Sequence, residues 1–409
     1  MARRCGSWYD KRFPALQFPT RAAMSEPIFE ELKQALASGG VESAFERLAE
    51  QLRAGQRYHE LFDARLMQSR WRLGLPVILT TSLEDLPEPG RTQVEDAYLE
   101  ACREVGQLLL SQGKVREAWM YLRPAGDKQA VAAVLEQITP VEEQVEELID
   151  VALHQGVSPR FGFQLVLNNY GTCNAITMFD SQMHDRPRPE RQQVAGLLVG
   201  HLHNELLRNL EAEITRQEGT PPREKTIRDL VADRDWLFLD DNYHIDTSHL
   251  SSVVRFARVL EEPEALRLAV DLTEYGRRLS QQYQFAGEEP FVDGYVDQAR
   301  FYRAQYGEEV EEALKFFGGK ARSLPVEEHG AAPVEVYVSL LARLKRYDEA
   351  IAALAELLPA GARTAGFAPT LGELSKAAGQ FDRMVAVSQE RGDVLGFAAS
   401  LIERQLQGK

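Results

Sequence analysis

The sequence predicts an all-α fold, and three observations lead to that prediction. Segments 45–55 (FERLAEQLRAG) and 94–114 (VEDAYLEACREVGQLLLSQGK) place apolar residues at the i, i+3, i+4, i+7 spacing of a single helix face. Glycine or proline follows the ends of such segments, as it does where helices stop. Alternating β-branched runs are almost absent, and the β-like piece at 75–82 (LPVILTTS) is too isolated to form a sheet.

The composition excludes several classes of protein. The 409 residues carry a formal net charge of −15 and are 44% hydrophobic, so the chain can bury a sizeable core but lacks the basic face of a general nucleic-acid binder. No apolar run approaches the roughly 18 residues of a membrane span. The three cysteines, Cys5, Cys102 and Cys173, are scattered, as in proteins of a reducing compartment. We expect a cytoplasmic protein that binds neither nucleic acid nor membrane.

The first 23 residues differ from the rest of the chain. They carry five basic residues against one acid, Asp10, without the apolar region of a secretory signal. A transit peptide is one interpretation, and a disordered leader or an over-long start is the other, which we favour. Met24 opens a segment in which Ser25 can cap a helix and Pro27 suits its first turn.

A ten-residue pattern recurs along the helical part. Segments 113–122 (GKVREAWMYL), 345–354 (KRYDEAIAAL) and 379–388 (GQFDRMVAVS) share a turn residue, a spaced bulky residue, an acidic step and then small or apolar residues, and 39–48 is a weaker copy. This pattern resembles the start of the second helix in a tetratricopeptide (TPR) repeat. The resemblance implies that Ala118 and Ala350 let paired helices approach closely. It also implies that the hairpins stack as a TPR-like α-solenoid, because one hairpin cannot bury its apolar face alone, and that the protein binds a protein or peptide partner.

The distribution of these patterns predicts three regions. Residues 24–138 and 332–409 are repeat-like, whereas residues 139–331 form a less regular central helical region. The segment 217–225 (QEGTPPREK) reads as an exposed loop. The aromatic-rich stretch 281–307 is expected to pack between helices, with a peptide groove as the alternative.

The central region contains a small polar core within segment 162–180 (GFQLVLNNYGTCNAITMFD). Gly171 stands inside a helical pattern, where it predicts a kink or a close approach. Cys173 has no cationic neighbour that would activate its thiol, so we expect a buried small residue at a close helix crossing. The candidate ligand-binding residues here are Asn169, Tyr170, Cys173 and Asn174.

Segment 194–214 (VAGLLVGHLHNELLRNLEAEI) predicts a strong helix. His201 and Glu205 lie one turn apart at the edge of its apolar stripe. A histidine and a carboxylate so placed can ligate one metal or form a base and its orienter; the plainer interpretation is a hydrogen bond on the helix surface. His203 points in another direction, so His201 and His203 are not expected to bind the same metal ion.

The third segment is 236–254 (WLFLDDNYHIDTSHLSSVV). Asp246 or Thr247 is well placed to cap the helix that follows, whose core face includes Leu250 and Val253. Capping leaves His244 and His249 unexplained. Tyr243, which precedes them, is a further candidate ligand-binding residue.

Two interpretations of the central region stay open. In the first, the protein is a helical-repeat scaffold with a polar pocket that binds a protein or ligand. In the second, it is a metal-dependent enzyme of the hydrolase type, in which His201, Glu205, His244 and His249 hold one divalent transition metal. Imidazole and carboxylate together suit Zn, Fe or Mn, and Glu205 or Asp246 would serve as the catalytic base.

Overall fold

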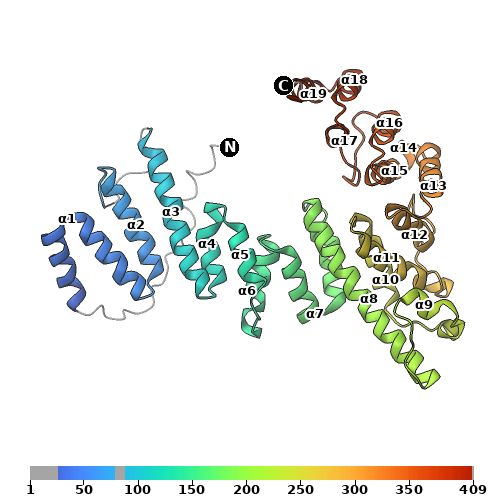
Figure 1. Cartoon of the computed structure of the whole chain (residues 1–409), viewed down its shortest axis with the longest axis horizontal. Helices are drawn as coiled ribbons and strands as arrows, with labels where there is room; N and C mark the ends of the chain where they lie inside the picture. The colour runs from blue at the N-terminus through green and yellow to red at the C-terminus, as the bar shows by residue number, and fades with distance from the viewer. Residues whose placement is uncertain (1–25, 79–87, 408–409) are drawn as a thin grey trace. The chain divides into compact units, whose positions relative to one another are not determined.

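The computed structural model describes residues 26–78 and 88–407, and every regular element within those ranges is a helix (Figure 1). The all-α prediction is confirmed for the described residues. The leader and the cap expected at Ser25 lie outside them. None of the helices in the described ranges is long and apolar enough to cross a membrane.

The chain divides into two compact units, residues 1–165 and 166–409, and the boundary falls inside α7. The predicted region boundaries near residues 138 and 331 stay predictions.

Unit 1 consists of helices that pack on their neighbours in the chain. The pairs α1–α2, α2–α3 and α3–α4 are in contact. At the α3–α4 crossing a side chain at Gly106 would meet Leu122 at 2.5 Å, so the absence of a Cβ permits the close approach. Its helices are α1 (Glu26–Ala54), α2 (Tyr58–Arg72), α3 (Gly90–Ser111), α4 (Val115–Ala125), α5 (Lys128–Leu135), α6 (Val145–Ile149) and the start of α7 (Pro159–Gln182).

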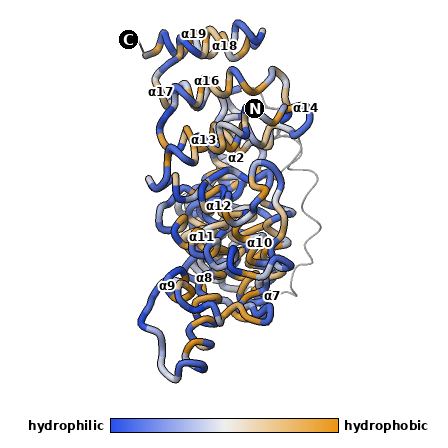
Figure 2. Tube along the Cα trace, turned by 90° about the vertical axis from the view of Figure 1, so that its right-hand side faces the viewer, coloured by the Kyte–Doolittle hydropathy of each residue, from blue (hydrophilic) through white to orange (hydrophobic). Residues whose placement is uncertain are grey.

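Unit 2 is built around the long helix α8, which packs against α10 and α11. In Figure 2 these helices lie together and carry hydrophobic stretches. The stripe of α8 predicted from Val194 to Leu210 is buried throughout. Many of the later helices pack against the next helix in the chain, as in the pairs α11–α12, α15–α16 and α18–α19. The bounds are α8 (Arg188–Glu218), α9 (Ile227–Ala232), α10 (Thr247–Phe256), α11 (Pro263–Gly276), α12 (Gly294–Gln305), α13 (Val310–Ser323), α14 (Val326–His329), α15 (Ala332–Arg343), α16 (Tyr347–Leu357), α17 (Leu371–Ala378), α18 (Phe381–Glu390) and α19 (Val394–Gln407).

One type of turn recurs where a helix follows another. At each of the three strong copies of the sequence pattern a residue with positive φ ends the first helix, and the second helix begins two residues later. The residue directly after the positive-φ residue donates its backbone N–H to the carbonyl five residues earlier, as in a Schellman motif. These bonds run from Lys114 to Leu109, from Arg346 to Leu341 and from Gln380 to Ser375. The same bond closes the turns before α2, α5 and α19, by Arg57, Asp127 and Asp393. The sequence pattern therefore marks a real structural joint. Ala118 and Ala350 are buried beside it, as expected.

The aromatic-rich stretch 281–307 packs between helices. Phe291, Phe301 and Tyr302 are buried, and the rings of Phe291 and Phe301 meet edge to face. Arg343 of α15 lies over the ring of Phe301 and donates to the carbonyls of Arg258 and Leu260. These carbonyls end the α10 segment, where cations are favoured. The core interpretation of the aromatic stretch is confirmed for these side chains.

Candidate functional site

The predicted kink in α7 lies at Gly171. Its φ of 82° and ψ of 174° interrupt the helix, and this left-handed φ is one that glycine adopts without steric cost. The amide of Asn174 donates to the carbonyl of Tyr170 at 2.7 Å, across the kink. Asn169, Tyr170 and Asn174 are exposed, and Tyr170 as a residue is 46% accessible. The kink thus presents a short polar and aromatic surface.

The expectation that Cys173 is buried is wrong. Cys173 is exposed, because after the kink Ala175 and Ile176 occupy the buried side of α7 and Cys173 lies on the other side. The buried cysteine of the described chain is Cys102 in unit 1. Burial raises the pKa of the Cys102 thiol to about 11, so it is not a thiolate nucleophile near neutral pH.

His201 of α8 faces the kink. Its Nε2 lies 3.0 Å from the hydroxyl of Thr172 and 3.8 Å from the carboxylate of Glu205. A nucleophile–base–acid relay uses both ring nitrogens, one for the hydroxyl and the other for the carboxylate. Here the hydroxyl and the carboxylate share one nitrogen, so the three side chains do not form such a relay. The hydrogen bond expected between His201 and Glu205 is not formed at this distance; His201 bonds Thr172 of α7 instead, and Glu205 is only a nearby charge.

His203 points away from His201, as predicted. It is buried, and its Nε2 lies 3.3 Å from a carboxylate oxygen of Asp271 on α11. Arg228 of α9 lies 3.8 Å from the other oxygen. Sequence reasoning missed Asp271 as a partner. The available signal was an acidic residue at a core position of an otherwise apolar helix face.

Asp246 is the N-cap of α10. Its Oδ1 accepts from the backbone N–H groups of Ser248 and His249, at 2.9 and 3.0 Å, and from the Ser248 hydroxyl. The Ser248 hydroxyl is the main reason that the pKa of this carboxyl is lowered. A carboxylate so stabilised is a weak proton acceptor, so the capping role accounts for Asp246 and the base role is not supported.

His244 is held by its backbone and its ring. Its N–H donates to the Tyr275 hydroxyl at 2.7 Å, its carbonyl accepts from Asn209 at 2.7 Å, and its Nδ1 lies 3.1 Å from the same hydroxyl. Burial lowers the pKa of His244, and the nearby carboxylate of Glu213 partly opposes that effect. Tyr275 was not predicted, since no local pattern links it to a histidine 31 residues earlier.

The metal hypothesis finds no support in this arrangement. Over residues 26–78 and 88–407, no three His, Cys, Asp or Glu side chains are grouped so as to hold a metal ion. His201 pairs with Thr172, His244 with Tyr275, and the N–H of His249 with Asp246. Tyr243 is half-exposed and meets the ring of Tyr283 edge to face at 5.1 Å.

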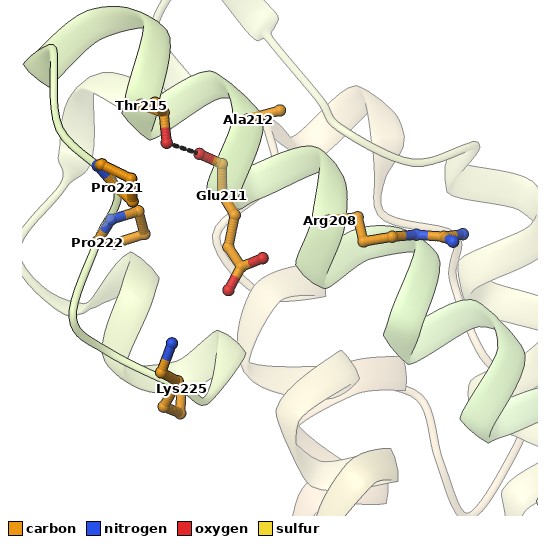
Figure 3. Close-up of a pocket in the computed structure, with 7 residues that line it drawn as sticks. All are labelled: Arg208, Glu211, Ala212, Thr215, Pro221, Pro222 and Lys225. Carbon is orange, nitrogen blue, oxygen red and sulfur yellow. Dashed lines mark hydrogen bonds between the residues drawn. The ribbon is translucent and has the colours of Figure 1, made fainter.

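A polar stripe runs along α8 from the kink to a pocket. His201, Glu205, Arg208, Ala212 and Thr215 follow at the spacing of one helix face and are at least partly accessible. The pocket has a volume of about 510 Å³ and lies between α8 and segment 219–226 (Figure 3). Its lining consists of Arg208, Glu211, Ala212, Thr215, Pro221, Pro222 and Lys225. We call the accessible side chains at 169–174 and this stripe, with its pocket, the α7–α8 face.

No family model, no curated protein and no solved structure matches this chain.

Proposed function

We propose that this chain is a helical-repeat protein of the TPR-like, α-solenoid type that binds a protein or peptide partner along the α7–α8 face. The observation that carries the proposal is the polar stripe of α8, which runs from His201, in contact with Thr172 at the kink of α7, to the pocket lined by Arg208. The recurring Schellman turn supports the repeat architecture, because identical joints give successive hairpins the same geometry. The scattered cysteines favour the cytoplasm as its compartment.

The dimensions of the face suit a short extended peptide. From His201 to Thr215 the stripe is about 21 Å long at 1.5 Å per residue, which matches about six residues of extended chain. Asn169 and Asn174 carry amide groups of the kind that pair with peptide backbone. Tyr170 offers a rigid aromatic surface of the type that dominates binding energy at interfaces. The mixed charges of Glu205 and Arg208 would set the direction of the peptide.

Phage display of a random peptide library on the full-length protein tests the proposal. Peptides enriched on the wild type should bind Tyr170→Ala and Arg208→Ala at least tenfold more weakly, since truncation of an anchoring residue commonly costs about 2 kcal/mol. Arg277→Ala, which removes an exposed arginine at the end of α11, is the matched control and should bind as the wild type does. The proposal fails if no peptide is enriched, or if the enriched peptides bind both α7–α8 variants with wild-type affinity.

A further inference from the structure

The loop that closes the pocket beside α8, residues 219–226, is held at both ends. Gly219 ends α8 in the left-handed conformation, with a φ of 74°. The side chain of Arg234 donates to Glu218 at the end of α8, at 2.6 Å, and to Glu224 in the loop, at 3.1 Å. Because one guanidinium binds both carboxylates, the loop has little freedom to move. The pocket of about 510 Å³ is therefore formed before a ligand binds, which lowers the entropic cost of binding.

The charged side chains around this loop do not balance. Eight charged residues lie between positions 208 and 225. Glu213 pairs with Arg216, and the two carboxylates that Arg234 binds are also neutralised. Within the part of the chain that the structure describes, the other four form no ion pair; they are Arg208, Glu211, Arg223 and Lys225. Three unpaired cations against one carboxylate give this region a positive excess, although the chain as a whole carries a net charge of −15.

Three of the four unpaired side chains line the pocket. Arg208 and Glu211 come from α8, whereas Lys225 comes from the loop on the opposite side (Figure 3). Pro221 and Pro222 form the rigid apolar wall on the loop side. Two cations and one carboxylate give the lining a net charge of +1. A carboxylate balances that charge, whereas a phosphate group, with a charge of about −1.5 to −2 near neutral pH, would leave a negative excess. A lysine or arginine side chain would add to the positive excess and is repelled.

We propose that the pocket binds a carboxylate side chain, Asp or Glu, of the peptide that occupies the α7–α8 face. This inference rests on the proposed function and adds to it the sequence preference that the pocket imposes on the peptide. The ammonium of Lys225 and the guanidinium of Arg208 attract the carboxylate, and hydrogen bonds between charged groups are stronger than neutral ones. Glu211 repels it, so the balance of the lining charges sets the selectivity of the pocket.

Selection from a random peptide library on the full-length protein tests this preference. Because displayed peptides are fused to a coat protein through their C-terminus, a carboxylate that enters the pocket must come from a side chain. The enriched peptides should share an Asp or Glu at one position. Synthetic, C-terminally amidated peptides with the matching Asn or Gln should bind about tenfold more weakly. Enriched peptides without a shared acidic position would overturn this inference and leave the proposed function standing, whereas a selection that enriches no peptide would overturn both.

Two substitutions in the lining should act in opposite directions on the same peptides. Lys225→Glu changes the net charge of the lining from +1 to −1, so the acidic peptides should no longer bind and a fresh selection should enrich Lys or Arg at that position. Glu211→Gln removes the repulsion and should strengthen binding about threefold, a gain that misfolding cannot produce. Arg223→Gln is the matched control, because it removes an unpaired cation of the same loop that does not line the pocket; the affinity should stay within about twofold of the wild type. The inference is wrong if Lys225→Glu still selects acidic peptides, or if Glu211→Gln weakens binding.

Discussion

The backbone N–H of His244 donates to the hydroxyl of Tyr275 at 2.7 Å, and the ring Nδ1 of the same histidine lies 3.1 Å from that hydroxyl. Tyr275 is fully buried in α11, so this contact ties the loop before α10 to the core of unit 2. The side chain of Asn209 on α8 holds the carbonyl of His244 from the other direction. The histidine thus joins three helical segments, which explains its place in a polar loop without a metal.

Removal of the Tyr275 hydroxyl should destabilise unit 2. Tyr275→Phe keeps the ring but leaves the His244 N–H without its acceptor, at a cost of about 1–2 kcal/mol. We expect a lower midpoint of urea unfolding, followed by circular dichroism. Tyr243→Phe removes a hydroxyl from a half-exposed tyrosine and should leave the midpoint unchanged. Equal midpoints for Tyr275→Phe and the wild type would contradict the structural role.

The stability of unit 2 should fall in mild acid because of His244. Burial lowers its pKa below the ordinary value of 6.5, while Glu213 partly opposes the shift. Between the folded and unfolded pKa values the unfolded chain binds more protons, so the free energy of unfolding rises with pH across that interval. The stabilisation is complete above the unfolded pKa and is lost as the pH falls below it.

Urea unfolding at about pH 7.5 and about pH 5.5 measures this effect. The wild type should lose more stability on acidification than His244→Asn, which has no imidazole to protonate. His184→Asn, at an exposed histidine, should lose as much as the wild type. If His244→Asn and the wild type lose the same amount, the pH dependence has another origin.

The sequence predicted those features of the fold that depend on residues close together in the chain. The core positions of α10, the buried stripe of α8 and the cap at Asp246 follow from helical periodicity and from backbone groups within three residues. The orientation of Cys173 did not follow, because it depends on the direction that α7 takes after Gly171. The partners of His244 and His203 lie 31 and 68 residues away, and only the packing of α8 and α11 brings them together.

Two substitutions test whether Asp246 acts as a helix cap or through its negative charge. Asp246→Ala removes the acceptor of the Ser248 and His249 N–H groups and should cost about 1 kcal/mol of stability. Asp246→Asn retains an acceptor oxygen and should cost much less, since asparagine caps helices nearly as well. Thermal unfolding midpoints of the two variants provide the comparison. If asparagine costs as much as alanine, the negative charge of Asp246 matters more than its cap.

Gly171 and Gly200 should respond in opposite directions to the same substitution. Neither has an atom within 4 Å of where a Cβ would stand, but Gly171 has a φ of +82° whereas Gly200 lies inside the regular helix α8. Gly171→Ala forces an alanine into the left-handed region and should lower the free energy of unfolding by about 1–2 kcal/mol. Gly200→Ala reduces the freedom of the unfolded chain and should raise it by about 0.5–1 kcal/mol. Because space is equal at the two sites, a loss of stability in both variants would mean that the kink in α7 is not what distinguishes them.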